Sequence, residues 1–115
     1  MEEKIMQEIL RKAPFGYAYH KLVYNAEGLP EDYIFLDVNH AFEEMTGLKR
    51  EAILGKRVTD ILPGIRNSGF DWVDFYGKAV LCGERREFTQ YAEPLGRWYK
   101  ITAFAPQKGH FITIF

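Results

Sequence analysis

The chemically reactive side chains of this chain are few and widely spaced. There is one cysteine, Cys82, and there are three histidines, His20, His40 and His110. A lone cysteine forms no internal disulfide and no cysteine-based metal site, and the histidines stand in separate segments without the spacing of metal ligands. We therefore expect no metal site. We interpret Cys82 as an ordinary core or surface residue and each histidine as partly exposed.

Acid–base catalysis is the other chemistry that the residue types permit. Asp37, Asn39 and His40 are close in the sequence, but strand alternation and helix capping explain them without a catalytic role. No Gly-x-Ser-x-Gly, Walker or dinucleotide-binding motif supplies a nucleophile or a phosphate site. We therefore expect no catalytic residues, and a small lyase-like or isomerase-like enzyme is the least favoured hypothesis.

Aromatic and apolar side chains form the positive candidate for a site. They could surround a cavity with apolar walls and a few hydroxyl and indole donors, which is the usual composition of a small-molecule pocket. The alternative, which stripes at helical spacing favour, is that the same side chains simply fill the core. The candidate ligand-pocket residues are Phe42, Met45, Ile61, Trp72, Phe75, Tyr76, Tyr91, Tyr99 and Ile101.

The composition is typical of one intracellular domain. A length of 115 residues suits a single domain. Fifteen basic and sixteen acidic side chains, mixed along the chain, produce no field that would favour nucleic acid or an anionic membrane surface. No apolar run approaches the roughly 18 residues that cross a bilayer, and no signal-peptide core is present. We expect a cytoplasmic location, no membrane insertion by this segment and no nucleic-acid partner.

The first segment has the pattern of an amphipathic helix. Between Met1 and Ala13, acidic residues lead, basic residues trail and Pro14 ends the segment. The apolar stripe of this helix needs cover, either from the domain's own sheet or from the same helix of a second copy, and both alternatives stay open. The stripe consists of Ile5, Met6, Ile9, Leu10 and Ala13.

Extended segments stand at both ends of the remaining chain. Residues 15–24 and 33–38 enclose turn-forming residues, which predicts a hairpin. Three more strands are predicted over 84–92, 98–105 and 110–115. With strands at both ends and helices between them, an antiparallel sheet covered on one face by the central helices satisfies burial best. The predicted fold class is α+β.

The central helices have their own start signals. Asn39 is a natural N-cap for one helix, and Asp71 caps the strongest helix of the chain. Gly77, inside that helix, costs about 1 kcal/mol relative to alanine, which indicates close approach to another backbone. Two short helices are predicted between them, over 50–54 and 59–62.

Alternation along the strand at 98–105 assigns its side chains to two faces. Tyr99 and Ile101 are expected under the helices, and Trp98 and Phe104 on the opposite face. The helix at the chain start is the one helix left to cover that face. The predicted dimer-interface residues are Ile5, Met6, Ile9, Leu10, Trp98 and Phe104.

This order of elements and four local strings resemble the PAS family. VNHAFEEMTG at 38–47 resembles the family's second strand and first helix, and ILGKRVTDILP at 53–63 its next two short helices. GRWYKITAFAP at 96–106 and GHFITIF at 109–115 resemble the fourth and fifth strands. Each string alone is a weak signal, but four in the right order are fairly specific, and the resemblance covers about 15–115.

The resemblance implies a PAS fold, with a five-stranded antiparallel sheet in the order 2-1-5-4-3 and helices over one face. We expect a flanking helix in 1–14 and the PAS sensory domain in 15–115. In this family a pocket over the sheet often holds a small ligand, the outer face often forms a homodimer, and a histidine kinase or diguanylate cyclase domain commonly follows.

The function implied by the resemblance is signal sensing in a bacterial signal-transduction protein of the two-component type. The domain would bind a small ligand or dimerise, and so regulate an output domain outside this chain. The alternative is a ligand-free dimerisation or docking module.

Two known cofactors of the family fit this sequence poorly. Light-sensing relatives need a cysteine after an asparagine in a GxNCRFLQ-like string, whereas this chain has GKRVT at 55–59. Haem-binding relatives usually take a histidine from the long helix, and residues 71–82 contain none. The resemblance therefore leaves the cofactor unknown.

Overall fold

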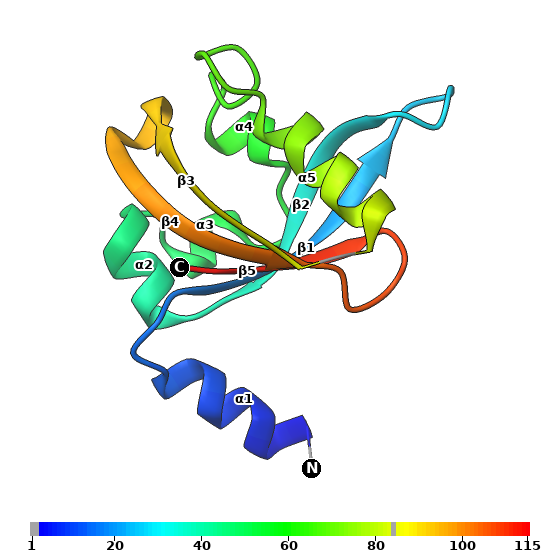
Figure 1. Ribbon diagram of the computed structural model, residues 1–115. Helices are drawn as coiled ribbons and strands as arrows, with labels where there is room; N and C mark the ends of the chain where they lie inside the picture. The colour runs from blue at the N-terminus through cyan, green and yellow to red at the C-terminus, as the bar shows by residue number, and fades with distance from the viewer. Residues whose placement is uncertain (1–2, 84) are drawn as a thin grey trace.

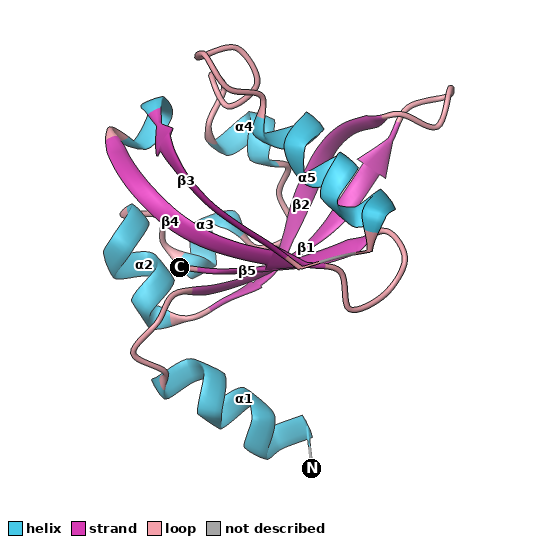
Figure 2. Cartoon of the chain, in the orientation of Figure 1, coloured by secondary structure: helices cyan, strands magenta, loops and turns pink. Residues whose placement is uncertain are grey.

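The computed structural model describes residues 3–83 and 85–115, together with all side chains of that range except those of Glu3, Leu81 and Cys82. Within this range the chain forms five strands and five α-helices (Figures 1 and 2). The helices are α1 (Glu3–Lys12), α2 (His40–Thr46), α3 (Arg50–Ile53), α4 (Val58–Ile61) and α5 (Trp72–Cys82), with a 3-10 turn η1 at Glu93–Leu95. The strands are β1 (Tyr17–Tyr24), β2 (Pro30–Val38), β3 (Arg86–Ala92), β4 (Arg97–Phe104) and β5 (His110–Ile114).

The strands of the described residues form one antiparallel sheet in the order β2-β1-β5-β4-β3. This is the order that the resemblance implied, and the predicted fold class is confirmed. The last strand, β5, lies between β1 and β4, so the two ends of the chain share the centre of the sheet. A bulge at Leu36 interrupts the β1–β2 pairing, because Tyr19 pairs with Asp37 while His20 pairs with Phe35.

Two side-chain caps begin the main helices where the sequence predicted them. The Asn39 Oδ1 atom accepts a hydrogen bond from the Phe42 amide at 3.0 Å. An Asp71 carboxylate oxygen accepts one from the Asp74 amide at 3.1 Å. These caps satisfy amide donors that have no partner inside the helix, which fixes where each helix starts.

Helix α5 crosses close over the start of β2 at Gly77. A β-carbon at this position would lie 2.3 Å from Cγ of Pro30, which no real contact tolerates. The close approach expected at Gly77 is therefore present, but its partner is a proline ring and not another backbone.

Several predicted boundaries need correction. Strand β1 begins at Tyr17 rather than Phe15, because the Phe15 carbonyl accepts a hydrogen bond from the Asn39 side chain at 2.9 Å. Strand β2 begins at Pro30 rather than Tyr33, so Pro30 and Asp32 belong to the strand and not to the turn. Strand β3 ends at Ala92 as predicted, and β4 begins one residue early, at Arg97, because η1 and Gly96, with positive φ, make the turn between them. The predicted helix start at Met1 and Glu2, and the predicted strand start at Glu84, lie outside the described residues.

Helices α2, α4 and α5 lie over one face of the curved sheet, and α1 projects away from it (Figure 1). The core between the helices and this inner face is rich in aromatic rings, including Phe35, Phe42, Trp72, Tyr76 and Phe111. Both the Phe42 helix and the Trp72 helix therefore lie on the same side of the sheet, as predicted.

The apolar stripe of α1 is not covered by the domain's own sheet. Ile5, Met6 and Ile9 are each close to half exposed, at 49%, 45% and 49%. Leu10, at the last turn, is half-buried, and its carbonyl accepts a hydrogen bond from the Asn39 Nδ2 group at 2.7 Å. The two alternatives for covering the stripe were the domain's own sheet and the same helix of a second copy. In this structure the domain's own sheet does not cover it.

None of the helices formed by residues 3–83 and 85–115 combines the length and the apolar character that a membrane-crossing helix needs.

Candidate functional site

A small, partly open cavity lies between the inner face of the sheet and the helices. The space open to the centre of a water molecule is about 50 Å³. Seventeen residues from both layers line it: His20, Tyr33, Phe35, Phe42, Thr46, Leu48, Val58, Leu62, Ile65, Trp72, Tyr76, Ala92, Leu95, Tyr99, Ile101, Thr113 and Phe115. Nearly all of this lining is apolar or aromatic, which is the composition expected of a small-molecule pocket.

Five of the nine predicted pocket residues line this cavity. They are Phe42, Trp72, Tyr76, Tyr99 and Ile101. Helix α2, helix α5 and strand β4 carry these residues, and all three elements present them toward the same space.

The other four predicted residues do not line the cavity. Met45, Ile61 and Phe75 are partly buried and pack against the outside of the core cluster. Tyr91 is 38% exposed, and its ring lies 5.5 Å from the ring of Trp98. Tyr91 faces outward because β3 pairs it with Trp98 of β4, so both residues project from the outer face of the sheet.

Most lining residues absent from the prediction come from the strands and the short helices. His20, Tyr33 and Phe35 lie on β1 and β2, and Thr113 lies on β5. Alternation within GHFITIF marks Phe111 and Thr113 as one face, and this is the signal that could have found Thr113. Only the register between strands shows which face is covered.

A row of small side chains explains why a cavity forms at this place. Thr113 pairs with Ala18 on one side and with Ala103 on the other. All three are almost completely buried, at 1%, 0% and 1% exposure. Larger aromatic residues surround this row, so the sheet provides a low floor under the helices.

His20 is a buried, uncharged imidazole in this wall. It is 2% exposed, so the expectation of a partly exposed histidine is wrong here. Burial lowers the pKa of His20 to about 3, and the contact of Nδ1 with the Phe111 carbonyl oxygen at 3.3 Å opposes this only in part. Its ring stacks on Phe111 with centroids 4.2 Å apart, which an aromatic neutral imidazole favours.

The other two histidines lie outside the core. The side chain of His40 is 68% exposed, and His110 is half-buried. Among the described residues, no group of three histidine, cysteine or carboxylate side chains could hold a metal ion. The side chain of Cys82 lies outside the described part of the chain.

The Thr113 hydroxyl is a fully buried polar group of the cavity wall that has no hydrogen-bond partner. Among the described residues, its Oγ1 is the one fully buried side-chain oxygen or nitrogen atom without a hydrogen bond. By contrast, the Tyr99 hydroxyl donates to the Met45 carbonyl at 3.0 Å. A buried polar group without a partner costs about 1–3 kcal/mol, so such a group calls for an explanation.

Burial also controls the ionisation of the tyrosines around the cavity. Desolvation raises the pKa of Tyr33 and of Tyr76, and nearby Asp32 adds to the effect at Tyr33. Neither phenol ionises at neutral pH. The lining contains no Asp, Glu, Lys or Arg, so with a neutral His20 the wall of the cavity is uncharged.

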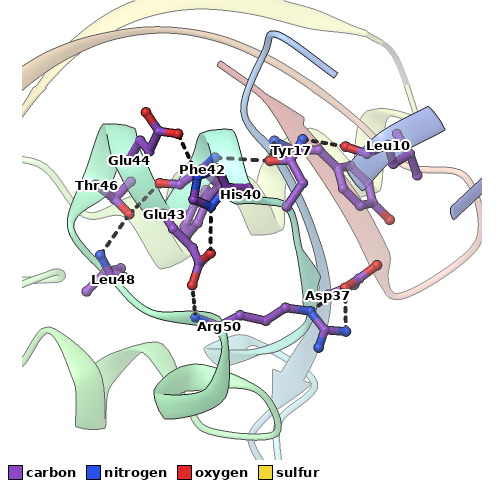
Figure 3. Close-up of polar contacts among 11 residues, drawn as sticks. Leu10, Tyr17, Asp37, His40, Phe42, Glu43, Glu44, Thr46, Leu48 and Arg50 are labelled. Atoms are coloured by element: carbon purple, nitrogen blue, oxygen red, sulfur yellow. Dashed lines mark hydrogen bonds and ion pairs between the residues drawn. The ribbon is translucent and has the colours of Figure 1, made fainter. Parts of the chain in front are cut away.

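A second polar region joins α1, β2 and α2 (Figure 3). The Arg50 guanidinium donates to Asp37 at 3.0 Å, and the Arg50 amide donates to a Glu43 carboxylate oxygen at 2.8 Å. This amide bond is the main cause of the lowered pKa of Glu43, to which His40 also contributes. The Asp37–Arg50 ion pair therefore ties β2 to α3, and the Arg50 amide ties α3 to α2, whereas His40 contacts Glu43 and Glu44 of its own helix.

Asn39 is the centre of this region. Its Oδ1 atom accepts from the amides of Tyr17 and Phe42, at 2.9 and 3.0 Å. Its Nδ2 group donates to the carbonyls of Leu10 and Phe15, at 2.7 and 2.9 Å. One side chain thus connects α1, β1 and α2, and Phe42 continues the connection to the cavity wall.

The outer face of the sheet carries apolar side chains. Trp98 is 69% exposed, and Phe104 is half-buried beside its pairing partner Ile112. Both predicted outer-face residues thus project on the side opposite to the helices.

Comparison with known proteins identifies the relatives of this architecture. A family model described as PAS domain matches residues 25–95, and no curated protein matches the sequence. A sensory box domain of a sensor histidine kinase/response regulator from Geobacter sulfurreducens superposes with a TM-score of 0.61 and 18% identity, covering 96% of this chain and 90% of the other.

Two further solved structures have the same fold. One is a domain of an HTR-like protein from Haloarcula marismortui, with a TM-score of 0.57, 14% identity, and coverage of 89% of this chain and 95% of that one. The other is the LOV domain of a blue-light activated histidine kinase from Erythrobacter litoralis, with a TM-score of 0.54, 22% identity, and coverage of 90% and 94%. The matched family model spans well over half of the sequence, and the strand order agrees with it. The chain belongs to the PAS domain family.

Proposed function

We propose that this chain is the sensory input domain of a signalling protein and that it binds a small molecule in the cavity over its sheet. The observation that carries the proposal is the cavity of about 50 Å³ with an apolar wall and a fully buried hydroxyl that has no hydrogen-bond partner. The similarity to domains of sensor histidine kinases supports the signalling role. The output domain would be of the histidine kinase or diguanylate cyclase type and would belong to the parent protein.

The contacts around the cavity suggest how ligand binding would affect α1 and the sheet. A ligand there touches Phe42 of α2, whose amide is held by Asn39, and Asn39 in turn holds the last turn of α1. It also touches Thr113 of β5, the central strand. Binding that favours one arrangement of these contacts would shift the populations of α1 and of the sheet.

Size limits what the cavity can hold as it stands. An engineered cavity of about 150 Å³ binds benzene, and the present cavity is smaller, at about 50 Å³. A flavin ring or a haem would therefore require the helices to move away from the sheet. The proposal needs no such cofactor.

Native mass spectrometry with a cavity-filling pair of variants tests ligand binding. Thr113→Ile extends a side chain into the cavity, whereas Thr102→Ile makes the same change on β4 at the outer face. We expect the unmodified protein and Thr102→Ile to retain a small molecule, or to take one up from a metabolite library, and Thr113→Ile to lose it. Equal binding by the two variants, or no binding by any of the three proteins, would contradict the proposal.

A second candidate function is a ligand-free dimerisation or docking module. The observation that favours it is the exposed apolar stripe of α1, Ile5, Met6 and Ile9, together with Trp98 on the outer face. A second copy of the chain could cover both. Sedimentation of the unmodified protein and of Ile5→Glu/Ile9→Glu tests this, with Glu8→Gln on the polar side of α1 as the control. A dimer that only the double variant breaks supports it, and a monomeric unmodified protein excludes it.

We propose further that the domain works in the cytoplasm and has no catalytic activity. The mixed surface charge supports the absence of a nucleic-acid partner. The isomerase-like alternative requires a carboxylate of raised pKa facing the cavity, and the lining contains no carboxylate.

A further inference from the structure

We infer that the cavity takes a compact, uncharged ligand of about three to five non-hydrogen atoms, which forms a hydrogen bond with the Thr113 hydroxyl. This inference rests on the proposed function, because it names the class of ligand for the same cavity. Three independent features support it, namely the absence of charge in the wall, the size of the cavity and the fully buried Thr113 hydroxyl without a partner.

The charge of the wall excludes an ionic ligand. A charged group transferred from water into a buried apolar site is costly unless an opposite charge or several hydrogen bonds meet it. The lining has no Asp, Glu, Lys or Arg, and its one imidazole, His20, is 98% buried and uncharged. Aromatic rings also attract cations. A test of the ligand class therefore needs a charged probe with the same shape as an uncharged one.

The size of the cavity limits the number of ligand atoms. A water molecule requires about 10–15 Å³ of space when the space is measured for water centres. A space of about 50 Å³ therefore corresponds to about three to five atoms of that size. A small alcohol, a small amide or a five-membered heterocycle fits this range, whereas a benzene-sized ligand exceeds it.

The position of Thr113 provides the polar anchor. Its hydroxyl is both a donor and an acceptor, and it stands on the low floor between Ala18 and Ala103. Both alanines are nearly fully buried and neither side chain can form a hydrogen bond. A ligand with one hydrogen-bonding group, placed over this row, would satisfy the hydroxyl while its apolar part contacts the rings of Phe42 and Tyr76.

Three five-membered rings of closely similar shape form the test. Pyrazole is uncharged and forms hydrogen bonds, imidazolium is the charged counterpart at about pH 5.5, and cyclopentene forms no hydrogen bonds. Each is titrated into the isotope-labelled protein, and backbone amide shifts are followed by two-dimensional NMR. We expect saturable shifts at Thr113 and Phe111 with pyrazole, weaker binding of cyclopentene, and no binding of imidazolium.

The variant Thr113→Val removes the hydroxyl and keeps the shape of the side chain. We expect pyrazole affinity to fall about fivefold, which corresponds to one neutral hydrogen bond, and cyclopentene affinity to stay unchanged or to rise. Without ligand, the melting temperature of Thr113→Val should rise by about 4 °C, because an unpartnered buried hydroxyl is lost. The NMR spectrum of the variant also verifies that it folds.

The outcomes separate this inference from the proposed function. If imidazolium binds as tightly as pyrazole, or if Thr113→Val leaves pyrazole affinity unchanged, the ligand class is wrong while ligand binding in the cavity stands. A larger or charged molecule retained in native mass spectrometry has the same consequence. If none of the three rings binds and no molecule is retained, the cavity takes no ligand, and both proposals are wrong.

Discussion

The side chain of Asn39 provides the sharpest test of how α1 is held to the domain. It is 4% exposed and forms four hydrogen bonds to backbone groups, two as acceptor and two as donor. The variant Asn39→Asp retains both acceptor contacts. It replaces both donors with a carboxylate oxygen that faces the carbonyl oxygens of Leu10 and Phe15.

The magnitude of the expected loss follows from these contacts. Removing the helix cap costs about 1 kcal/mol, and each of the other three hydrogen bonds about 0.5–1.5 kcal/mol. Asn39→Ala should therefore lower the free energy of unfolding by about 2.5–5.5 kcal/mol. Asn39→Asp should lose about 2–3 kcal/mol at neutral pH, and part of this should return in acid, because a protonated carboxyl group can again donate.

Urea denaturation combined with amide hydrogen exchange measures both effects. A helix as short as the ten residues of α1 is marginal without tertiary contacts, so its amides should exchange much faster in both variants. Asp71→Ala is the matched control, since it removes the cap of α5 and leaves α1 attached. Unchanged exchange of α1 in Asn39→Asp, or a loss below about 1 kcal/mol in Asn39→Ala, would refute the anchoring role.

Further predictions concern the core and the close approach of α5. His20 has a pKa of about 3 in the folded state against 6.5 when unfolded, so its contribution to stability is complete above pH 6.5 and declines as the pH falls toward 3. Between pH 7 and pH 4.5, urea titration should show a loss of about 2–3 kcal/mol that His20→Phe removes and His110→Phe retains. Gly77→Ala should cost about 1–3 kcal/mol despite the better helix propensity of alanine, because the new methyl group meets the ring of Pro30. The double variant Gly77→Ala/Pro30→Ala should recover most of that loss, and an additive effect in urea denaturation would contradict the contact.

Local signals in the sequence predicted the helices and their faces well. Asn39 and Asp71 act as caps in the structure, and the stripe that contains Trp72 and Tyr76 faces the sheet. Caps and helical stripes depend on residues within one or two turns of each other, so one segment of sequence is enough to recognise them. The order of the strands came instead from the resemblance to the PAS family.

The strand contribution to the site was harder to predict, because it depends on register. Tyr91 was assigned to the pocket, but pairing with β4 turns it outward and turns Phe88 and Gln90 inward. Residue type was also misleading. His20 and Thr113 are polar side chains that are usually exposed, yet both are almost fully buried next to the cavity.

The central position of β5 has a mechanical consequence. The Phe115 amide donates to the Gly16 carbonyl at 2.9 Å, so the last residue lies beside the chain segment that connects α1 to the sheet. Any polypeptide joined to Phe115 would leave from the same edge as α1. A small displacement at the base of α1 would then be felt directly at the point where such a polypeptide begins.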